Sequence, residues 1–254
     1  MKNSNRTPEK YIPGGEFPVL WDGPLPTPSV RSAEDLRGVL ADRTCTSTGP
    51  VYSMYRDISR SAADHRWLTS QHLRFDITVI PPRVICGEFI KTKGHYHPEN
   101  PAGTGYPEVY EVQSGTAHYL IQNHDFSHIL MIAASDGQVV VIPPGYGHVT
   151  INPSLNTVLQ MANIVSTRFE SDYRGYELFH GAAYFEKVRE GFVKNPAYKN
   201  SSSLRLARIP QQTGVSGLID APLYDLVEKQ AAVLEFLNRP EKYESLFQDL
   251  WEYT

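Results

Sequence analysis

The chain has 254 residues but little cysteine, no long apolar run and no excess of positive charge. Cys45 and Cys86 are the only cysteines and lack CxxC spacing, so we expect two inert or buried thiols and a reducing compartment. No stretch approaches the roughly 18 apolar residues of a membrane span, and the N-terminal residues lack the apolar core of a signal peptide. The formal charge of −4 gives no basic footprint for nucleic acid. These absences predict a soluble cytoplasmic protein that binds no membrane and no nucleic acid.

The distribution of proline, glycine and apolar residues divides the chain into three regions. Residues 1–30 are crowded with proline and glycine, which predicts that residues 1–47 are an extension that wraps the core. Within this extension, Ser32 is a candidate N-cap of a helix. Residues 48–186 are short β-rich runs separated by turn residues, which predict an antiparallel sandwich or barrel. In residues 187–254, apolar spacings of three and four predict a helical appendage packed on the β core.

Two histidines and a glutamate stand on either side of the loop PENPAGTGYP. His95 and His97 are separated by one residue, so in an extended chain both imidazoles face one side, about 6.5 Å apart along the chain. Glu108 opens the next β-rich run and can bring a carboxylate from the neighbouring strand. Tyr110 shares the face of Glu108, whereas Glu111 is expected to point away. This spacing is typical of a metal site inside a barrel.

A third imidazole comes later, where the turn PPGYG precedes His148 at the head of another strand. Three imidazoles and one carboxylate leave open positions on a six-coordinate ion, as a site for a metal-bound substrate needs. Ligands of this kind without a thiolate suit Fe(II), Mn, Ni, Co or Zn, and the residues alone do not choose. The other histidines are assigned to surface or packing roles, with an outer role beside the metal left open for His118: His65, His72, His118, His124, His128 and His180.

The whole set resembles the two signature motifs of the cupin superfamily. The pattern G-x5-P-x-G-x2-H-x3-N is met by Gly137, Pro143, Gly145, His148 and Asn152. The other motif is carried by His95, His97, Glu108 and Gly115, with a longer loop than usual and the upstream glycine displaced to Gly87. The resemblance implies a mainly β fold, a cupin double-stranded β-helix or jelly-roll barrel, with an N-terminal extension and a C-terminal helical appendage. Residues 48–186 are then the catalytic domain.

Longer segments resemble the cupin-type glucose-6-phosphate isomerases, first familiar from archaea: PVYSMYR (50–56), KTKGHYH (91–97), PEVYEVQSG (107–115) and VIPPGYGHVTIN (141–152). Carried over by position, the resemblance implies one divalent metal per subunit, with Fe(II) the first choice, held by His95, His97, Glu108 and His148. It also implies that neutral groups hold a sugar phosphate: the hydroxyls of Tyr52, Thr78 and Thr92 and the backbone N–H of Gly94. Lys93 either adds charge there or is solvated.

The activity implied by this resemblance is the interconversion of glucose 6-phosphate and fructose 6-phosphate, a step of glycolysis and gluconeogenesis. Tyr110 and Tyr173 match tyrosines near the reacting end of the sugar, and Ser171 stands where some members have histidine. Glu108 either moves the proton through a cis-enediol or stays a ligand during a hydride shift. Two other functions stay open: a cupin metal-dependent dioxygenase with an apolar pocket, and a non-catalytic sugar-phosphate-binding protein. By analogy with other cupins, we expect a homodimer.

Overall fold

The structure is a computed structural model that describes residues 9–10, 17–210, 222–228, 231–248 and 250–253. Its strands are β1 Glu9–Lys10, β2 Val19–Leu20, β3 Ser29–Ser32, β4 Pro50–Tyr55, β5 Leu73–Ile80, β6 Val84–Ile85, β7 Glu88–Phe89, β8 Glu108–Ser114, β9 Thr116–Asn123, β10 Ile129–Ser135, β11 Val139–Ile142, β12 Tyr146–Ile151, β13 Leu159–Ser166, β14 Tyr184–Lys187, β15 Gly191–Lys194, β16 Arg205–Arg208 and β17 Glu252–Tyr253. Its α-helices are α1 Ala33–Leu36, α2 Ala62–Ser70, α3 Arg174–Leu178 and α4 Ala231–Leu234. Its 3-10 turns are η1 Arg37–Val39, η2 Leu223–Leu226, η3 Glu235–Leu237, η4 Pro240–Lys242 and η5 Glu244–Phe247.

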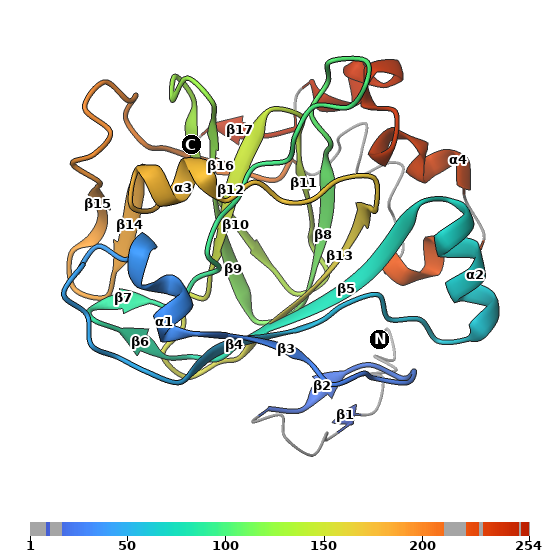
Figure 1. Cartoon of the computed structure of the whole chain (residues 1–254), viewed down its shortest axis with the longest axis horizontal. Helices are drawn as coiled ribbons and strands as arrows, with labels where there is room; N and C mark the ends of the chain where they lie inside the picture. The colour runs from blue at the N-terminus through green and yellow to red at the C-terminus, as the bar shows by residue number, and fades with distance from the viewer. Residues whose placement is uncertain (1–8, 11–16, 211–221, 229–230, 249, 254) are drawn as a thin grey trace.

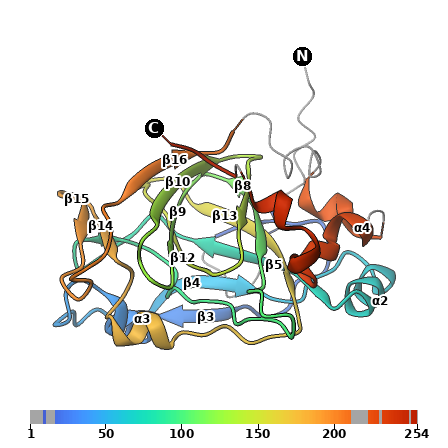
Figure 2. The same cartoon turned by 90° about the horizontal axis from the view of Figure 1, so that it is seen from above.

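Two sheets face each other and form the barrel at the centre of Figures 1 and 2. One has the strand order β11-β8-β13-β5-β4-β3, and the other has the order β12-β9-β10-β16-β17. From β8 to β13 the chain passes repeatedly between the two sheets, and the pairs that these strands form with one another are antiparallel. This is the strand order of a jelly-roll. The predicted mainly β, cupin-type fold is therefore confirmed.

The alternation of side chains along β5 separates the cavity from the outer core. Phe75 and Ile77 belong to an apolar cluster on the outer face of the larger sheet, whereas Asp76 and Thr78 line a cavity inside the barrel. Successive residues of a strand point to opposite faces, so one strand serves both regions. Another part of the outer cluster comes from the C-terminal segments and includes Leu223, Leu226, Leu234, Phe236 and Leu237. These segments therefore pack on the barrel, as their apolar spacing predicted.

The short elements differ in part from the sequence predictions. Ser32 caps α1 with a capping box, as predicted, although the helix is only one turn long and continues as η1. Helix α2 was not predicted; the Ser61 side chain caps it by accepting from Asp64 N. Residues 205–208 form a strand that pairs parallel with β10. Within the part of residues 187–254 that the structure describes, helix therefore accounts for only short segments. The boundaries of the predicted regions, at residues 47 and 186, stay predictions.

No described helix has the length and apolarity to cross a membrane.

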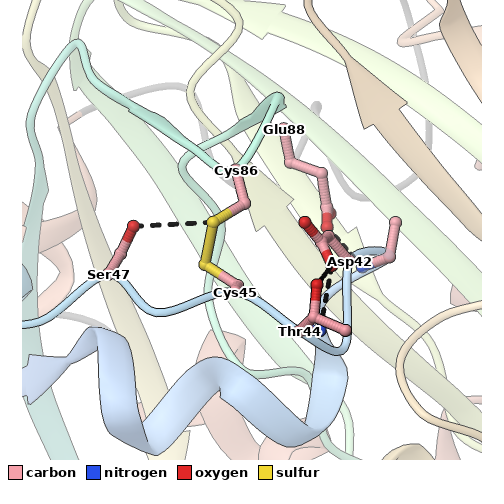
Figure 3. The surroundings of a disulfide bond; sticks show 7 residues. Asp42, Thr44, Cys45, Ser47, Cys86 and Glu88 are labelled. Carbon is pink, nitrogen blue, oxygen red and sulfur yellow. Dashed lines mark hydrogen bonds between the residues drawn. A yellow bond between two sulfur atoms is a disulfide. The ribbon is translucent and has the colours of Figure 1, made fainter.

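The prediction of inert cysteines was wrong, because Cys45 and Cys86 form a disulfide with a Cα–Cα distance of 5.9 Å. Figure 3 shows the bond joining the segment after η1 to the turn between β6 and β7. Sequence spacing could not reveal the pair, because the two cysteines are 41 residues apart and only the fold brings them together. Disulfides persist mainly in oxidising compartments. The predicted cytoplasmic location therefore loses the support it took from the cysteines.

Candidate metal centre

Four side chains inside the barrel bring their ligand atoms to one point. The ligand atoms of His95, His97, Glu108 and His148 all lie within 4.8 Å of one another. The Nε2 atoms of His95 and His97 are 3.1 Å apart, and Oε2 of Glu108 is 3.4 Å from Nε2 of His97 and of His148. The backbones of His95 and His148 pair through two hydrogen bonds of 3.1 and 3.3 Å. This pairing places the motif that contains His95 and His97 beside the motif that contains His148.

The hydrogen bonds around these ligands prepare them for a cation. His97 donates from Nδ1 to the carbonyl of Tyr106 at 2.8 Å, which leaves Nε2 available as a ligand. Asn163 donates to Oε1 of Glu108 at 2.7 Å, whereas Oε2 is buried without a hydrogen bond. A buried carboxylate oxygen without a partner is costly unless an ion satisfies it. The group therefore fits a metal, and its mixed imidazole and carboxylate donors are those of first-row divalent ions.

The electrostatic surroundings keep the ligands in their metal-binding protonation states. Burial lowers the pKa of His148 to about 4, against an opposing effect of Glu108. Burial, with His148 and His97 nearby, also holds the pKa of His95 well below its usual value. Burial opposes ionisation of Glu108, but its contact with His97 and the neighbouring imidazoles bring the pKa of this carboxyl below the usual value. At neutral pH His95 and His148 thus present neutral imidazoles and Glu108 presents a carboxylate, as metal binding requires.

Acid should destabilise the protein once a chelator has removed any metal. Between pH 6.5 and 4, His148 takes up a proton in the unfolded chain but stays neutral in the folded one, so the free energy of unfolding falls as the pH falls. At 1.36 kcal/mol per pKa unit, the loss across this window is roughly 3 kcal/mol for His148 alone. Denaturant titration at several pH values measures it, with His148→Asn as the control that should flatten the slope. An equal stability of the chelated wild type at pH 6.5 and 4 would contradict the expectation.

The cavity of about 310 Å³ that holds the ligands also contains the other predicted site residues. Thr78 projects from β5, and its hydroxyl has no hydrogen bond among the described residues. The Thr92 hydroxyl accepts from Thr150 N at 2.9 Å, and the Tyr52 hydroxyl accepts from Lys93 N at 3.3 Å. The structure thus places every predicted site residue around one cavity: Tyr52, Thr78, Thr92, Gly94, His95, His97, Glu108, Tyr110, His148 and Tyr173.

Gly94 has a backbone that only glycine fits at this position. Its φ is +82°, and an added Cβ would lie 2.6 Å from Val149 and 2.7 Å from the Tyr176 ring. The chain therefore approaches its neighbours closely here, between Thr92 and His95.

Tyr110 is held in position inside the cavity, because its hydroxyl lies 3.0 Å from Nε2 of His148. Burial, together with the charge of Glu108, raises its pKa well above the usual value, so Tyr110 stays a proton donor.

Sequence analysis missed the arginines around this cavity, whereas it named Lys93 as either a charge at the phosphate or a solvated side chain. Arg31 lies opposite Tyr52 in the pairing of β3 with β4, and its guanidinium carbon is 5.6 Å from the ring centroid of Tyr173. Lys93 Nζ is 5.3 Å from the same ring and 2.7 Å from a carboxylate oxygen of Glu177. Arg31 comes from the N-terminal extension, so only the register of β3 could reveal it. Two further arginines, Arg56 and Arg74, line the cavity itself.

The loop between His97 and Glu108 makes direct contacts within the site. Tyr106, at its end, accepts the hydrogen bond from His97 and stacks on Phe169, with ring centroids 4.8 Å apart. Phe169 in turn packs against the His97 ring. Asn100 donates to Glu241 of the C-terminal segments at 2.8 Å. The loop therefore positions a ligand and contacts the C-terminal segments, which its length alone did not indicate.

Other residues of the two motifs and the remaining histidines lie away from the ligand group. His118 pairs with Glu186 at 2.9 Å and does not line the cavity. Asn152 donates to the carbonyls of Ile80 and Thr157, so it holds a turn. Glu111 accepts from Leu223 N at 2.7 Å, pointing away from the cavity as predicted.

Ser171, by contrast, lines the cavity that holds the ligand group.

A family model and sequence relatives of the chain point to the same family. A model described as "Glucose-6-phosphate isomerase (GPI)" matches residues 30–202. The glucose-6-phosphate isomerase of Thermococcus litoralis is 35% identical over 130 residues, which are 49% of this chain and 62% of that protein. That of Thermococcus gammatolerans is 30% identical over 128 residues, 48% of this chain and 61% of that protein. The match therefore spans about three-fifths of the length of these relatives.

Proposed function

Because the chain belongs to the glucose-6-phosphate isomerase family, we propose that it interconverts glucose 6-phosphate and fructose 6-phosphate. The observation that carries the proposal is a single cavity that joins a four-ligand group to a set of hydroxyl donors. A volume of about 310 Å³ is at the lower end of the range of small-molecule sites. Charged and hydroxyl side chains line this cavity, whereas a dioxygenase site was expected to be apolar. The substrate is thus a polar, anionic sugar phosphate.

The reacting end of the sugar lies at the ligand group in this proposal. A divalent ion held by His95, His97, Glu108 and His148 would act as a Lewis acid toward the oxygens on carbons 1 and 2. Fe(II) remains the first choice, with Mn, Ni, Co or Zn as alternatives. Tyr110, protonated and fixed near His148, would donate to a sugar oxygen.

The chemistry moves one carbon-bound hydrogen between carbons 2 and 1 of the open sugar, and one hydroxyl proton between O2 and O1. In the proton route Glu108 is the base that takes the hydrogen from carbon 2 and returns it to carbon 1. In the hydride route that hydrogen moves with its electron pair, and Glu108 remains only a ligand. Ser171 does not titrate near neutral pH, so Tyr173 or a water molecule would assist ring opening. A deuterium label at carbon 2 separates the routes, because extensive exchange with solvent requires the base.

The phosphate end lies at Tyr52, Thr78, Thr92 and Gly94, as the family resemblance implies, and Arg31 adds a cation beside it. Arg31 Nε is buried without a hydrogen bond, although its planar fork is suited to phosphate oxygens. The earlier expectation of purely neutral donors is therefore extended by a guanidinium group. The predicted homodimer and cytoplasmic location are kept as part of the proposal.

Changing Arg31 to glutamine should weaken phosphate binding without altering the chemistry. We expect KM for fructose 6-phosphate to rise about tenfold, the typical size of a lost charge-assisted hydrogen bond, with kcat changed less than about twofold. Arg37→Gln is the matched control, because Arg37 is exposed on the next turn. Steady-state kinetics of both variants give the comparison. A fall in kcat at unchanged KM would argue against a phosphate contact.

The direct test of the proposed function is a coupled assay of purified, metal-loaded protein with fructose 6-phosphate. We expect turnover that a chelator abolishes and that readded Fe(II) or another of the named ions restores. The absence of turnover with every one of these ions would refute the isomerase. Oxygen consumption, measured in the same samples with an electrode, would instead favour the dioxygenase.

A further inference from the structure

Another cavity, here called the outer cavity, lies beside the loop that positions His97. Its volume of about 740 Å³ is within the range of small-molecule sites. Its walls come from the loop 98–106 and from five residues far beyond it in sequence: Arg168, Phe169, Asn238, Arg239 and Glu241. The last three lie outside residues 30–202, which the family model matches. The outer cavity is therefore built in part from a region that the isomerase family model does not cover.

The outer cavity adjoins the metal centre through two aromatic side chains. Phe169 lines both the outer cavity and the cavity that holds the ligand group. Its ring packs against His97, with ring centroids 4.4 Å apart, and stacks on Tyr106 at 4.8 Å. Tyr106 also lines the outer cavity, and its carbonyl accepts the hydrogen bond from His97. A molecule in the outer cavity would therefore touch the two residues that hold the ring of one metal ligand.

Two guanidinium groups reach the outer cavity, and one of them is unused. Arg239 lies 3.5 Å from a carboxylate oxygen of Glu235. The Arg168 side chain has no hydrogen bond and no ion pair among the described residues. Its backbone is nevertheless fixed, because Arg168 N donates to Ser166 Oγ at 3.2 Å and that hydroxyl donates to Asn238 at 2.8 Å. Arg168 is thus a positioned cation without a partner.

Two carboxylates lie on the same wall, and neither takes up this cation. Glu241 accepts from the Asn100 side chain at 2.8 Å, and Glu99 is exposed to solvent. The planar fork of Arg168 therefore keeps its donors for an external anion. Such a fork matches the oxygens of a phosphate, which it can bind through two hydrogen bonds at once.

The rest of the wall is suited to a flat apolar group. Pro98, Pro101, Tyr106 and Phe169 contribute rings to it. Aromatic side chains are the usual stacking partners of nucleobases, because every base has a π face. A phosphate and a planar ring on one molecule are the chemistry of a nucleotide, and the volume of the outer cavity is sufficient for a ligand of that size.

We propose that the outer cavity binds a nucleoside phosphate and that this binding strengthens metal binding at the ligand group. The phosphate lies on Arg168 and Arg239, and the base packs against Tyr106 and Phe169. Because these two aromatic residues hold His97, the bound nucleotide restricts its imidazole to the orientation that faces the other ligands. The coupling is reciprocal, so a bound metal strengthens nucleotide binding by the same factor. This site goes beyond the proposed function, since neither its binding nor its coupling requires turnover.

Calorimetric titration of Mn(II)-loaded protein with AMP tests the site. In Arg168→Gln we expect the affinity for AMP to fall about tenfold or more, and Arg239→Gln should also lower it. Adenosine, which lacks the phosphate, should bind wild type and Arg168→Gln with affinities that differ by less than about twofold. Arg66→Gln, at an exposed position on α2, removes the same charge outside both cavities and should bind AMP as wild type does.

The affinity for Mn(II), measured by competition with a chelator, tests the coupling. With AMP present at saturation, we expect wild type to hold the ion at least about fivefold more tightly. Arg168→Gln should show no such gain at the same AMP concentration, which also corrects for binding of free Mn(II) by AMP. Without AMP the two proteins should hold the ion equally, because Arg168 does not line the cavity of the ligand group.

The outcomes separate this inference from the proposed function. A wild type that does not bind AMP, or two arginine variants that bind it as tightly as wild type, would overturn the site. Competitive displacement of AMP by fructose 6-phosphate would also overturn it, because the nucleotide would then occupy the cavity of the ligand group. Binding of AMP without a gain in metal affinity would overturn the coupling. A protein that isomerises fructose 6-phosphate but ignores AMP refutes this inference alone, whereas one that binds AMP as described without turnover refutes only the isomerase.

Discussion

A His148→Ala variant is expected to lose at least about 100-fold in metal affinity and a similar factor in isomerase activity. Changing even an outer partner of a metal ligand typically costs 10- to 100-fold in affinity or activity, and His148 is one of the four ligands themselves. It is also almost fully buried, so water replaces its Nε2 poorly. Metal content after dialysis and kcat/KM for fructose 6-phosphate measure the two losses.

The matched control for this variant is His128→Ala. His128 is exposed and its Nδ1 lies 3.0 Å from the Tyr146 hydroxyl, so its loss removes an imidazole without touching the cavity. Glu108→Gln adds a second comparison, because it keeps the shape and the contact with Asn163 but removes the charge. A His148→Ala protein that retains its metal and its activity would show that the ligand group is not the working centre. Thermal unfolding of each variant without metal distinguishes loss of the ion from loss of the fold.

The ligands could be predicted from sequence because local rules suffice for them. The i, i+2 spacing of His95 and His97 sets both imidazoles on one side, and the PPGYG turn places His148 at the head of a strand. The motif then relates the two segments to each other. The same period-two rule correctly separated Tyr110, which lines the cavity, from Glu111, which bonds the C-terminal segment.

The cationic part of the site could not be predicted, because it depends on pairing between strands that are distant in sequence. Only the register of β3, β4 and β5 brings Arg31 opposite Tyr52. The fold likewise places Arg56 and Arg74 on the wall of the cavity. In the sequence alone, nothing distinguishes any of these arginines from an ordinary solvated one. The low net charge of the chain also suggested an absence of basic clusters, although a whole-chain sum says nothing about local placement. The structure therefore adds residues to the predicted substrate contacts, whereas it leaves the predicted set of metal ligands unchanged.

Loss of the Cys45–Cys86 bond is expected to lower the free energy of unfolding by up to about 4 kcal/mol. A cross-link that closes a loop of 41 residues removes conformational entropy of this size from the unfolded chain. For a chain of this length the melting temperature should fall by roughly 10 °C. The Cys45→Ser, Cys86→Ser double variant, compared with wild type by calorimetry under non-reducing conditions, measures the difference.

The bond also bears on the site, because the segment it anchors follows β3, the strand that supplies Arg31. Near the bond, Glu88 accepts from Ala41 N, so the segment keeps one polar tie to the core when the sulfur atoms are reduced (Figure 3). We therefore expect the double variant to fold and to keep its kcat, with a higher KM if β3 loosens. Wild type treated with a reductant should have the melting temperature of the double variant. The melting temperature of the variant itself should not change with the reductant. Wild type that melts equally with and without reductant would show that the bond contributes no stability, and the entropy argument would then fail.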